Sequence, residues 1–121
     1  MSSDRMDINE SSEIYNLLSN SRRLQVIRYL SLFEVGFTIE VRQLARAIGG
    51  IEGRISPQLV ESKEYESVYN GLIQCHLPKL AKQGVIQYNT QSKEVTVTPK
   101  LKQYQTVDHC ARFIMSCKMG L

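Results

Sequence analysis

The sequence predicts an α+β domain, and one stretch carries most of that prediction. Residues 66–99, ESVYNGLIQCHLPKLAKQGVIQYNTQSKEVTVTP, begin with apolar residues at helical spacing, pass a glycine and end in two alternating strands. Helical patterns and a short β-branched stretch precede it. Helices followed by a hairpin are the element order of a winged helix-turn-helix. The predicted fold is therefore an α+β winged helix-turn-helix with a two-stranded β wing and an added C-terminal helix.

The whole chain has the size and composition of one domain. Its 121 residues are 42% hydrophobic, enough for a core, but they are too few for two domains. We expect a flexible N-terminal tail at 1–10, the winged helix DNA-binding domain at 11–98 and a C-terminal dimerisation helix at 99–121. The start lacks a basic-then-apolar signal, and no apolar run approaches the roughly twenty residues of a membrane span. A cytoplasmic protein without a membrane partner is the prediction.

The first half is expected to supply three helices and one strand. A short helix over about 12–18 precedes a second helix, RRLQVIRYLSLF, and a brief strand at 37–41 follows. The third helix, RQLARAIGG, is expected to stop at the Gly49–Gly50 pair. The connection after it is long for the turn of a helix-turn-helix. We interpret 49–63 as a surface insertion with one helical turn near its end.

Residues 63–83 are expected to form the recognition helix. Its apolar face is wide and consists of Tyr65, Tyr69, Leu72, Ile73, His76, Leu77 and Leu80. Pro78 lacks an N–H and crowds the carbonyl of Gln74, so it is expected to kink the helix or mark a boundary inside it. Gly84 ends the helix, and the hairpin 85–98 follows as the wing.

A second apolar stripe lies in the last segment of the chain. It consists of Leu101, Tyr104, Val107, Ala111 and Ile114, at steps of three and four residues. A helix with such a face needs a cover, and exposed apolar patches of this size usually mark interaction sites. We predict a homodimer interface there. Packing of the helix onto the first helix of its own domain is the alternative.

The residues expected to contact double-stranded DNA fall into two groups. Candidates for reading bases share the outer face of the early recognition helix: Ser67, Asn70, Gly71 and Gln74. Candidates for binding phosphates are basic: Lys79 and Lys82 from the helix, Lys93 from the wing turn, and Arg42 and Arg46 from the third helix. Residues 67–121 hold seven basic and two acidic side chains, whereas 1–66 hold eight and ten. This asymmetry favours a polyanionic partner, and an ordinary solvated surface is the alternative.

Two sequence blocks resemble a known superfamily. LSNSRRLQVIRYL at 18–30 is similar to the opening of arsenical-repressor-like winged helices, and CHLPKLAKQGVI at 75–86 resembles the end of their recognition helix. An archaeal family of uncharacterised winged-helix domains resembles the chain over about 13–98, through His-Leu-Pro-Lys-Leu and the following Gly-Val-Ile-x-Tyr. The resemblance implies a dimeric, DNA-binding transcriptional regulator of archaeal type.

Cysteine and histidine pairs raise the alternative of a metal- or redox-responsive repressor. Cys75–His76 and His109–Cys110 have ligand types that suit zinc or a thiophilic ion. His76 falls on the apolar stripe, however, and is expected to pack there with one hydrogen bond. No phosphate loop, nucleophile motif or carboxylate pair beside a histidine is present. We therefore predict no enzyme, no metal and no cofactor, and keep a winged helix used only for protein contacts as a further alternative.

Overall fold

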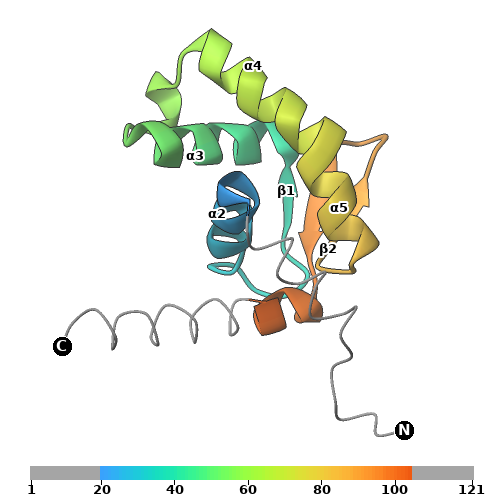
Figure 1. The fold of residues 1–121 in the computed structure, drawn as a ribbon. Helices are drawn as coiled ribbons and strands as arrows, with labels where there is room; N and C mark the ends of the chain where they lie inside the picture. Colours follow the sequence, from blue (N-terminus) through green and yellow to red (C-terminus); the bar gives the residue numbers. More distant parts are fainter. Residues whose placement is uncertain (1–19, 105–121) are drawn as a thin grey trace, which may run out of the picture.

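The computed structural model describes residues 20–104 (Figure 1). Its helices and strands are α2 (Ser21–Leu30), β1 (Thr38–Glu40), α3 (Val41–Gly53), the 3-10 turn η1 (Pro57–Leu59), α4 (Ser62–Gly71), the π-helical turn η2 (Leu72–His76), α5 (Leu77–Lys82), β2 (Ile86–Asn89) and β3 (Glu94–Val97). Residues 99–104 are helical as well. The tail expected at 1–10 and the first helix lie outside the described residues. The fold is α+β, as predicted.

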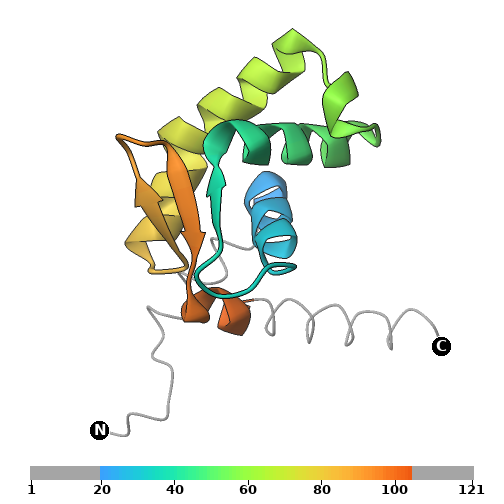
Figure 2. The ribbon, with the colours of Figure 1, turned by 180° about the vertical axis from the view of Figure 1, so that it is seen from behind.

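The strands form one antiparallel sheet in the order β1-β3-β2 (Figure 2). Val95 on the central strand lies opposite Ile39 of β1 and Tyr88 of β2. The predicted hairpin is confirmed, and the strand expected at 37–41 pairs with it as β1. In the hairpin turn, the Asn89 side chain accepts hydrogen bonds from the Gln91 and Ser92 N–H groups, and Lys93 has a φ of 57°. These two N–H groups have no strand partner in the turn, and the Asn89 side chain supplies the acceptor that holds the turn in place.

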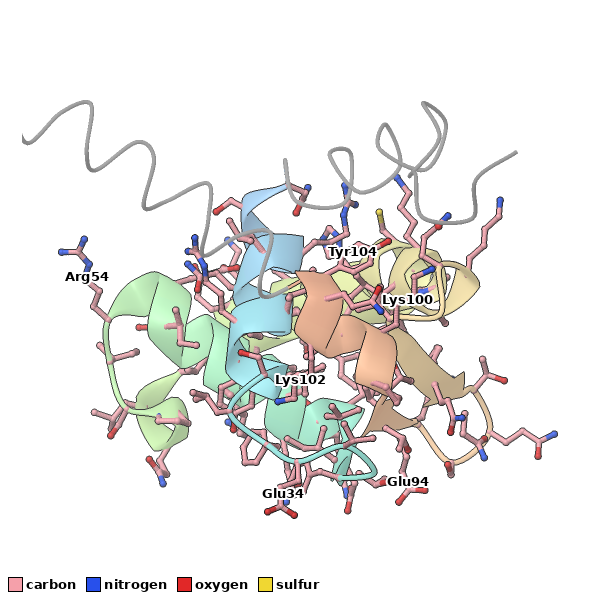
Figure 3. All side chains as sticks on the ribbon, turned by 90° about the horizontal axis from the view of Figure 1, so that it is seen from below. Glu34, Arg54, Glu94, Lys100, Lys102 and Tyr104 are labelled. Atoms are coloured by element: carbon pink, nitrogen blue, oxygen red, sulfur yellow. The ribbon has the colours of Figure 1, made fainter. Side chains whose placement is uncertain are left out.

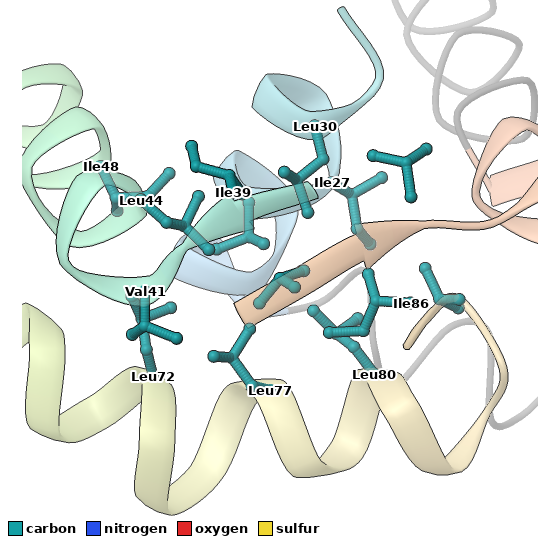
Figure 4. Close-up of a cluster of buried hydrophobic side chains, with 14 of the residues drawn as sticks. Ile27, Leu30, Ile39, Val41, Leu44, Ile48, Leu72, Leu77, Leu80 and Ile86 are labelled. Atoms are coloured by element: carbon teal, nitrogen blue, oxygen red, sulfur yellow. The ribbon is translucent and has the colours of Figure 1, made fainter. Parts of the chain in front are cut away.

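The core lies where the sheet meets the helices (Figure 4). Ile27 of α2 and Leu44 of α3 converge with Ile39 of β1, while Leu72 and Leu77 approach from the long helix that crosses the sheet. Their apolar side chains leave water completely or nearly so. Burial of this kind is the main favourable term in the stability of a small domain.

The Gly49–Gly50 pair does not end α3, contrary to the prediction. The helix continues to Gly53 and is capped by Arg54, whose φ of 56° is left-handed. A Cβ on Gly50 would lie 2.8 Å from the Ile55 carbonyl oxygen, and one on Gly49 would lie 3.0 Å from Cγ1 of Val60. The two glycines therefore let the connection to α4 fold back tightly onto α3. The connection is also shorter than predicted, because α4 begins at Ser62.

The expected recognition helix is divided at the place where Pro78 predicted a disturbance. Between α4 and α5 the chain widens into a π-helical turn, in which the Leu77 N–H donates to the Leu72 carbonyl. The extra residue in this turn makes the step between the two buried leucines five residues instead of four. The wider turn also relieves the crowding that Pro78 would impose on a regular helix.

The start of the C-terminal segment packs against its own domain. Leu101 and Tyr104, both expected at a dimer interface, belong to the core of the same chain. The Lys102 Nζ donates to the carbonyls of Ser31 (2.8 Å) and Phe33 (3.0 Å), just past the end of α2. These two residues therefore pack on their own domain, whereas the first helix, which the alternative named as their cover, lies outside the described residues. The other members of the predicted stripe, Val107, Ala111 and Ile114, lie outside the described residues.

Candidate nucleic-acid interface

The outer face of α4 and η2 is open to solvent. Ser67, Asn70 and Gln74 are exposed, as predicted for residues that read DNA, while Val68 on the opposite side is fully buried. Gly71 does not belong to this face. A Cβ there would lie 3.1 Å from Nη1 of Arg22, so the glycine faces α2 and provides space for that guanidinium.

The beginning of α3 and the hairpin turn lie together beside this helix. The Val41 N–H donates to the Lys93 carbonyl over 2.9 Å, which brings the exposed Arg42 next to the turn. The Arg42 Nη2 is 3.0 Å from Oε2 of Glu40, and this pairing raises the pKa of the guanidinium. Both side chains of this ion pair are substantially exposed, so the pair adds little to stability and leaves the Arg42 guanidinium accessible to solvent.

Three tyrosines connect α3, α4 and the hairpin. The Arg46 guanidinium lies 4.7 Å from the centroid of the Tyr65 ring, and the Tyr65 and Tyr69 rings are 5.8 Å apart. Burial, followed by the nearby Tyr69, raises the pKa of Tyr88. The rings are half-buried against the core and leave part of their surface at the rim of the α4 face.

The helical pattern predicts only packing for Tyr65 and Tyr69, because both lie on the apolar face of the expected recognition helix. Two residue pairs in the sequence point to this cluster of tyrosines and arginines. Arg42 and Arg46 are four residues apart on one helix, and Tyr65 and Tyr69 are four residues apart on the next. Side chains four residues apart lie on the same side of a helix. Two such pairs on helices that pack together produce mixed basic and aromatic contacts.

Lys79 and Lys82 are exposed but lie on a different part of the long helix. They belong to α5, which packs against β2, whereas the hairpin turn is bonded to the beginning of α3. With 1.5 Å per residue, Lys82 is roughly 22 Å along the helix from Ser67. The predicted phosphate contacts therefore form two groups, one with Arg42, Arg46 and Lys93, and one with the α5 lysines.

The chain around the beginning of α4 is acidic. Glu61, Glu64 and Glu66 are exposed, and Lys63 is the single basic residue among them. Negative charge is favourable at a helix N-terminus, where backbone N–H groups point outward. It opposes contact with phosphates, so a surface for DNA has to begin at Ser67.

The two sequence blocks that carry the family resemblance, 18–30 and 75–86, meet at the π-helical turn. Arg23 of α2 is buried, and its Nη1 lies 3.4 Å from Nδ1 of His76. An arginine only donates, so Nδ1 must be an acceptor and the imidazole neutral. Burial, and then the charge of Arg23, lower the pKa of His76 to about 4. The expectation that His76 packs with one hydrogen bond is confirmed.

The neighbouring arginine joins α2 to the end of α3. Arg22 donates from Nε and Nη2 to the two carboxylate oxygens of Glu52, over 2.7 and 2.9 Å. The hydrogen bond to Glu52 is the main reason that the pKa of Arg22 is raised. Arg22 and Arg23 therefore hold helices in place, and neither belongs to the candidate interface.

The cysteine and histidine pairs do not define a metal site in the described part of the chain. Cys75 carries a free, half-buried thiol. Between residues 20 and 104, no group of three or more histidine, cysteine or acidic side chains is placed to hold a metal ion. His109 and Cys110 lie outside this range. In the same range no helix is both long enough and apolar enough to cross a membrane.

The described chain is thus a small α+β domain with a three-stranded antiparallel sheet and an exposed helix beside a hairpin. It belongs to the family described as Domain of unknown function (DUF7344), whose model matches residues 15–96. No curated protein and no solved structure matched the chain.

Proposed function

We propose that the chain is a sequence-specific transcriptional regulator that binds double-stranded DNA as a homodimer, through a winged helix-turn-helix. The observation that carries this proposal is the exposed face of α4 and η2, with Arg42 and the hairpin turn beside it. In this arrangement α3 and α4 are the two helices of the motif. The hairpin of β2 and β3 is the wing.

Each part of the surface has a separate role in this proposal. Asn70 and Gln74 enter the major groove, where amide side chains form paired hydrogen bonds with adenine edges. Ser67 enters beside them, and its hydroxyl can donate to or accept from the edge of any base. Arg42 and Lys93 bind phosphates at the groove edge, and Lys79 and Lys82 bind phosphates farther along. Phosphate contacts fix the register of the protein and supply affinity, whereas base contacts supply specificity.

The tyrosines add hydrogen-bond donors to the same surface. Burial raises the pKa of Tyr88, and a phenol O–H is a donor to phosphate oxygens. Their rings are held by core packing, so little side-chain freedom is lost on binding. The dimer would place two such surfaces in successive major grooves, about 34 Å apart.

A winged helix used only for protein contacts remains a second candidate. The exposed Ile55 and Leu59, at the tip of the connection between α3 and α4, favour it. This candidate requires no DNA affinity. No described group of three or more histidine, cysteine or acidic side chains favours a metal-responsive repressor.

Selection from a library of random duplexes tests the proposal. The full chain should enrich a short motif, with two half-sites about one helical turn apart, and should bind the selected duplex at least about 1,000-fold more tightly than random DNA. No enrichment, together with no binding to any duplex at low salt, would favour the protein-contact candidate.

A further inference from the structure

The connection between α3 and α4 exposes apolar side chains on a backbone that hydrogen bonds hold in place. Ile51, Ile55 and Leu59 are 40%, 45% and 68% exposed. The Ile55 N–H donates to the Gly50 carbonyl over 3.0 Å, and the Leu59 N–H donates to the Ser56 carbonyl over 2.9 Å. We call Ile51, Ile55 and Leu59 the apolar tip. Neighbouring exposed apolar side chains indicate an interaction site more strongly than scattered ones do.

A groove lies on each side of Ile55, and the two grooves differ in charge. The first groove lies between the apolar tip and α2, and Arg54 is the charged side chain among the described residues that line it. The second groove lies between the apolar tip and α4. Three glutamates line it, Glu52, Glu61 and Glu64. Ile55 lines both grooves, so it separates a basic groove from an acidic one.

The charges beside the apolar tip are not neutralised within the described domain. Among residues 20–104, no acidic side chain forms an ion pair with Arg54, and no basic side chain forms one with Glu61 or Glu64. Glu52 differs, because Arg22 binds both of its carboxylate oxygens. Figure 3 shows Arg54 extending away from the rest of the domain. Both grooves can therefore pair with charges of a partner.

We infer that the apolar tip binds the apolar tip of a second copy of the chain in a symmetric dimer. Ile55 packs on the partner's Ile55, and Arg54 faces the partner's Glu61 and Glu64. This inference rests on the homodimer of the proposed function and assigns its interface. A two-fold axis that runs between the two grooves pairs each groove with the one of opposite charge, because such interfaces pair the same surfaces reciprocally.

The charge pattern favours a second copy over other occupants. An occupant of one charge sign would be attracted by one groove and repelled by the other, because like charges across an interface cost free energy. The chain's own ends are of this kind: residues 1–19 hold four acidic side chains and one basic one, and residues 105–121 hold one acidic and two basic ones. The tip itself carries both signs, one on each side of Ile55, as reciprocal pairing requires.

The position of the apolar tip also suits two DNA half-sites. Figure 1 shows α4 running away from the connection, so two copies that meet at the tip can carry their α4 helices outward. Asn70 and Gln74 lie about 14 Å and about 20 Å along the helix from Glu61, at 1.5 Å per residue. Two helices that point away from the axis therefore hold these amides roughly 30–40 Å apart. Half-sites in successive major grooves are about 34 Å apart.

The first experiment measures self-association of the full chain by sedimentation over a range of concentrations. The three apolar side chains expose far less than the roughly 800 Å² per partner of a standard interface, so we expect a weak dimer with a Kd on the order of 10 μM. Ile55→Glu should weaken it at least about tenfold, because two like charges then meet at the axis. Leu32→Glu is the matched control, since Leu32 is 76% exposed on the loop between α2 and β1. A wild type that stays monomeric, or equal effects of the two variants, would overturn the inference.

The second experiment tests the reciprocal charge pairing by mixing two variants. Arg54→Glu in one chain, and Glu61→Lys with Glu64→Lys in another, should each weaken self-association at least about tenfold, because like charges then face each other. An equimolar mixture should associate within about threefold of wild type, since every contact again joins opposite charges. Arg54→Asn should change association less than about threefold, because an exposed ion pair contributes little free energy. A folding defect, or cover by the chain's own ends, is not repaired by mixing, so a mixture that stays monomeric would overturn the inference.

The third experiment locates the axis by disulfide trapping. The background carries Cys75→Ser, Cys110→Ser and Cys117→Ser, which removes every native thiol. In this background Ile55→Cys should form an oxidised dimer readily, because the two copies of residue 55 meet at the axis. Leu32→Cys, the control, should remain monomeric under the same conditions. No oxidised dimer of Ile55→Cys, or equal yields from both positions, would overturn the inference.

These outcomes are separate from those of the proposed function. If DNA binding is salt-sensitive and sequence-specific but mixing does not restore association, only the interface assignment fails. If mixing restores association but the wild type binds no duplex at low salt, the interface stands and the DNA-binding function fails.

Discussion

At the scale of single residues, the missing side chain of Gly50 lets the connection between α3 and α4 pack closely against α3. Gly50 has no Cβ, and the Ile55 carbonyl oxygen occupies the space that one would need. Gly53, three residues later in the same helix, has only the flexible end of the Ile55 side chain nearby, at 3.5 Å. The two glycines therefore form a matched pair for substitution.

Gly50→Ala is expected to lower the free energy of unfolding by about 1–2 kcal/mol, because a backbone oxygen cannot move aside as a side chain can. Gly53→Ala should be neutral, or stabilise by a few tenths of a kcal/mol through helix propensity. Urea denaturation of both variants measures the difference. Equal stability of the two would show that the connection does not pack on α3 as described.

His76 is expected to make stability depend on pH. Its pKa is lowered to about 4 in the folded protein from 6.5. Between these values the unfolded chain binds more protons than the folded one, so stability is lost as the pH falls from 6.5 towards 4. The total loss should be a few kcal/mol at most.

The variant His76→Asn isolates this contribution, because asparagine offers an acceptor to Arg23 but does not titrate. The difference in unfolding free energy between wild type and variant should change across pH 4–6.5 and stay constant from pH 7 to 8. Denaturation curves at four or five pH values measure it. A constant difference over the whole range would mean that His76 titrates normally.

Single substitutions of Lys93 and Arg54 test where the phosphate contacts lie, because each removes one positive charge from a different end of α3. Both have left-handed φ angles, 57° and 56°, and asparagine tolerates that conformation. Lys93→Asn removes a charge beside Arg42, whereas Arg54→Asn removes one at the far end of α3. We expect the first to weaken DNA binding several-fold at low salt and the second to change it less than twofold. A larger effect of Arg54→Asn would move the surface to the other end of α3.

At the scale of elements, the long helix has two functions along its length. Core packing fixes Leu72 at the start of the π-helical turn and Leu77 directly after it, while Asn70 before the turn and Gln74 within it stay exposed. The basic residues of α5 come after the turn. This separation predicts different consequences for substitutions on the outer face of α4 and η2 and for substitutions in α5.

The double variant Asn70→Ala, Gln74→Ala should reduce the preference for a selected duplex over random DNA by at least tenfold, because it removes base contacts. Lys79→Ala should weaken binding to both duplexes alike, because phosphate contacts carry no sequence information. Fluorescence titrations with both duplexes measure these ratios. Equal losses on both duplexes for the double variant would contradict the assignment of the α4 face.

Helix and strand order could be predicted from the sequence because periodicity and turn residues are local. Pro78 marked the disturbed turn and Gly84, with a φ of 77°, ended the helix where expected. The end of α3 could not be predicted, because the reason for Gly49 and Gly50 is a contact with residues farther along the chain. The same holds for Gly71, which looks like part of an outer helix face until Arg22 is placed beside it.

The candidate site was predictable only in part for a similar reason. Exposure of Ser67, Asn70 and Gln74 follows from helical spacing alone. The proximity of Arg42 to Lys93 depends on the pairing of β1 with β3, which no local pattern encodes. Leu101 and Tyr104 were expected on a free face because their cover, the domain core, is distant in sequence.

At the scale of the whole molecule, the basic and polar surface beside α4 lies at one edge, and the loop between α2 and β1, with the exposed Leu32 and Val35, lies at the other (Figure 1). The described residues pack as one core, so the two surfaces are held in a fixed relation. A dimeric DNA-binding regulator needs such a fixed arrangement, because the distance between its two recognition helices must match the distance between the two DNA half-sites. The central claim is that the α4 edge binds DNA.

The salt dependence of DNA affinity tests that claim most directly. We predict that the full chain binds its selected duplex with an affinity that falls at least about 100-fold between 50 and 200 mM salt, because four or more phosphates are neutralised. An affinity that hardly changes over this range, or no measurable binding at 50 mM salt, would contradict the account.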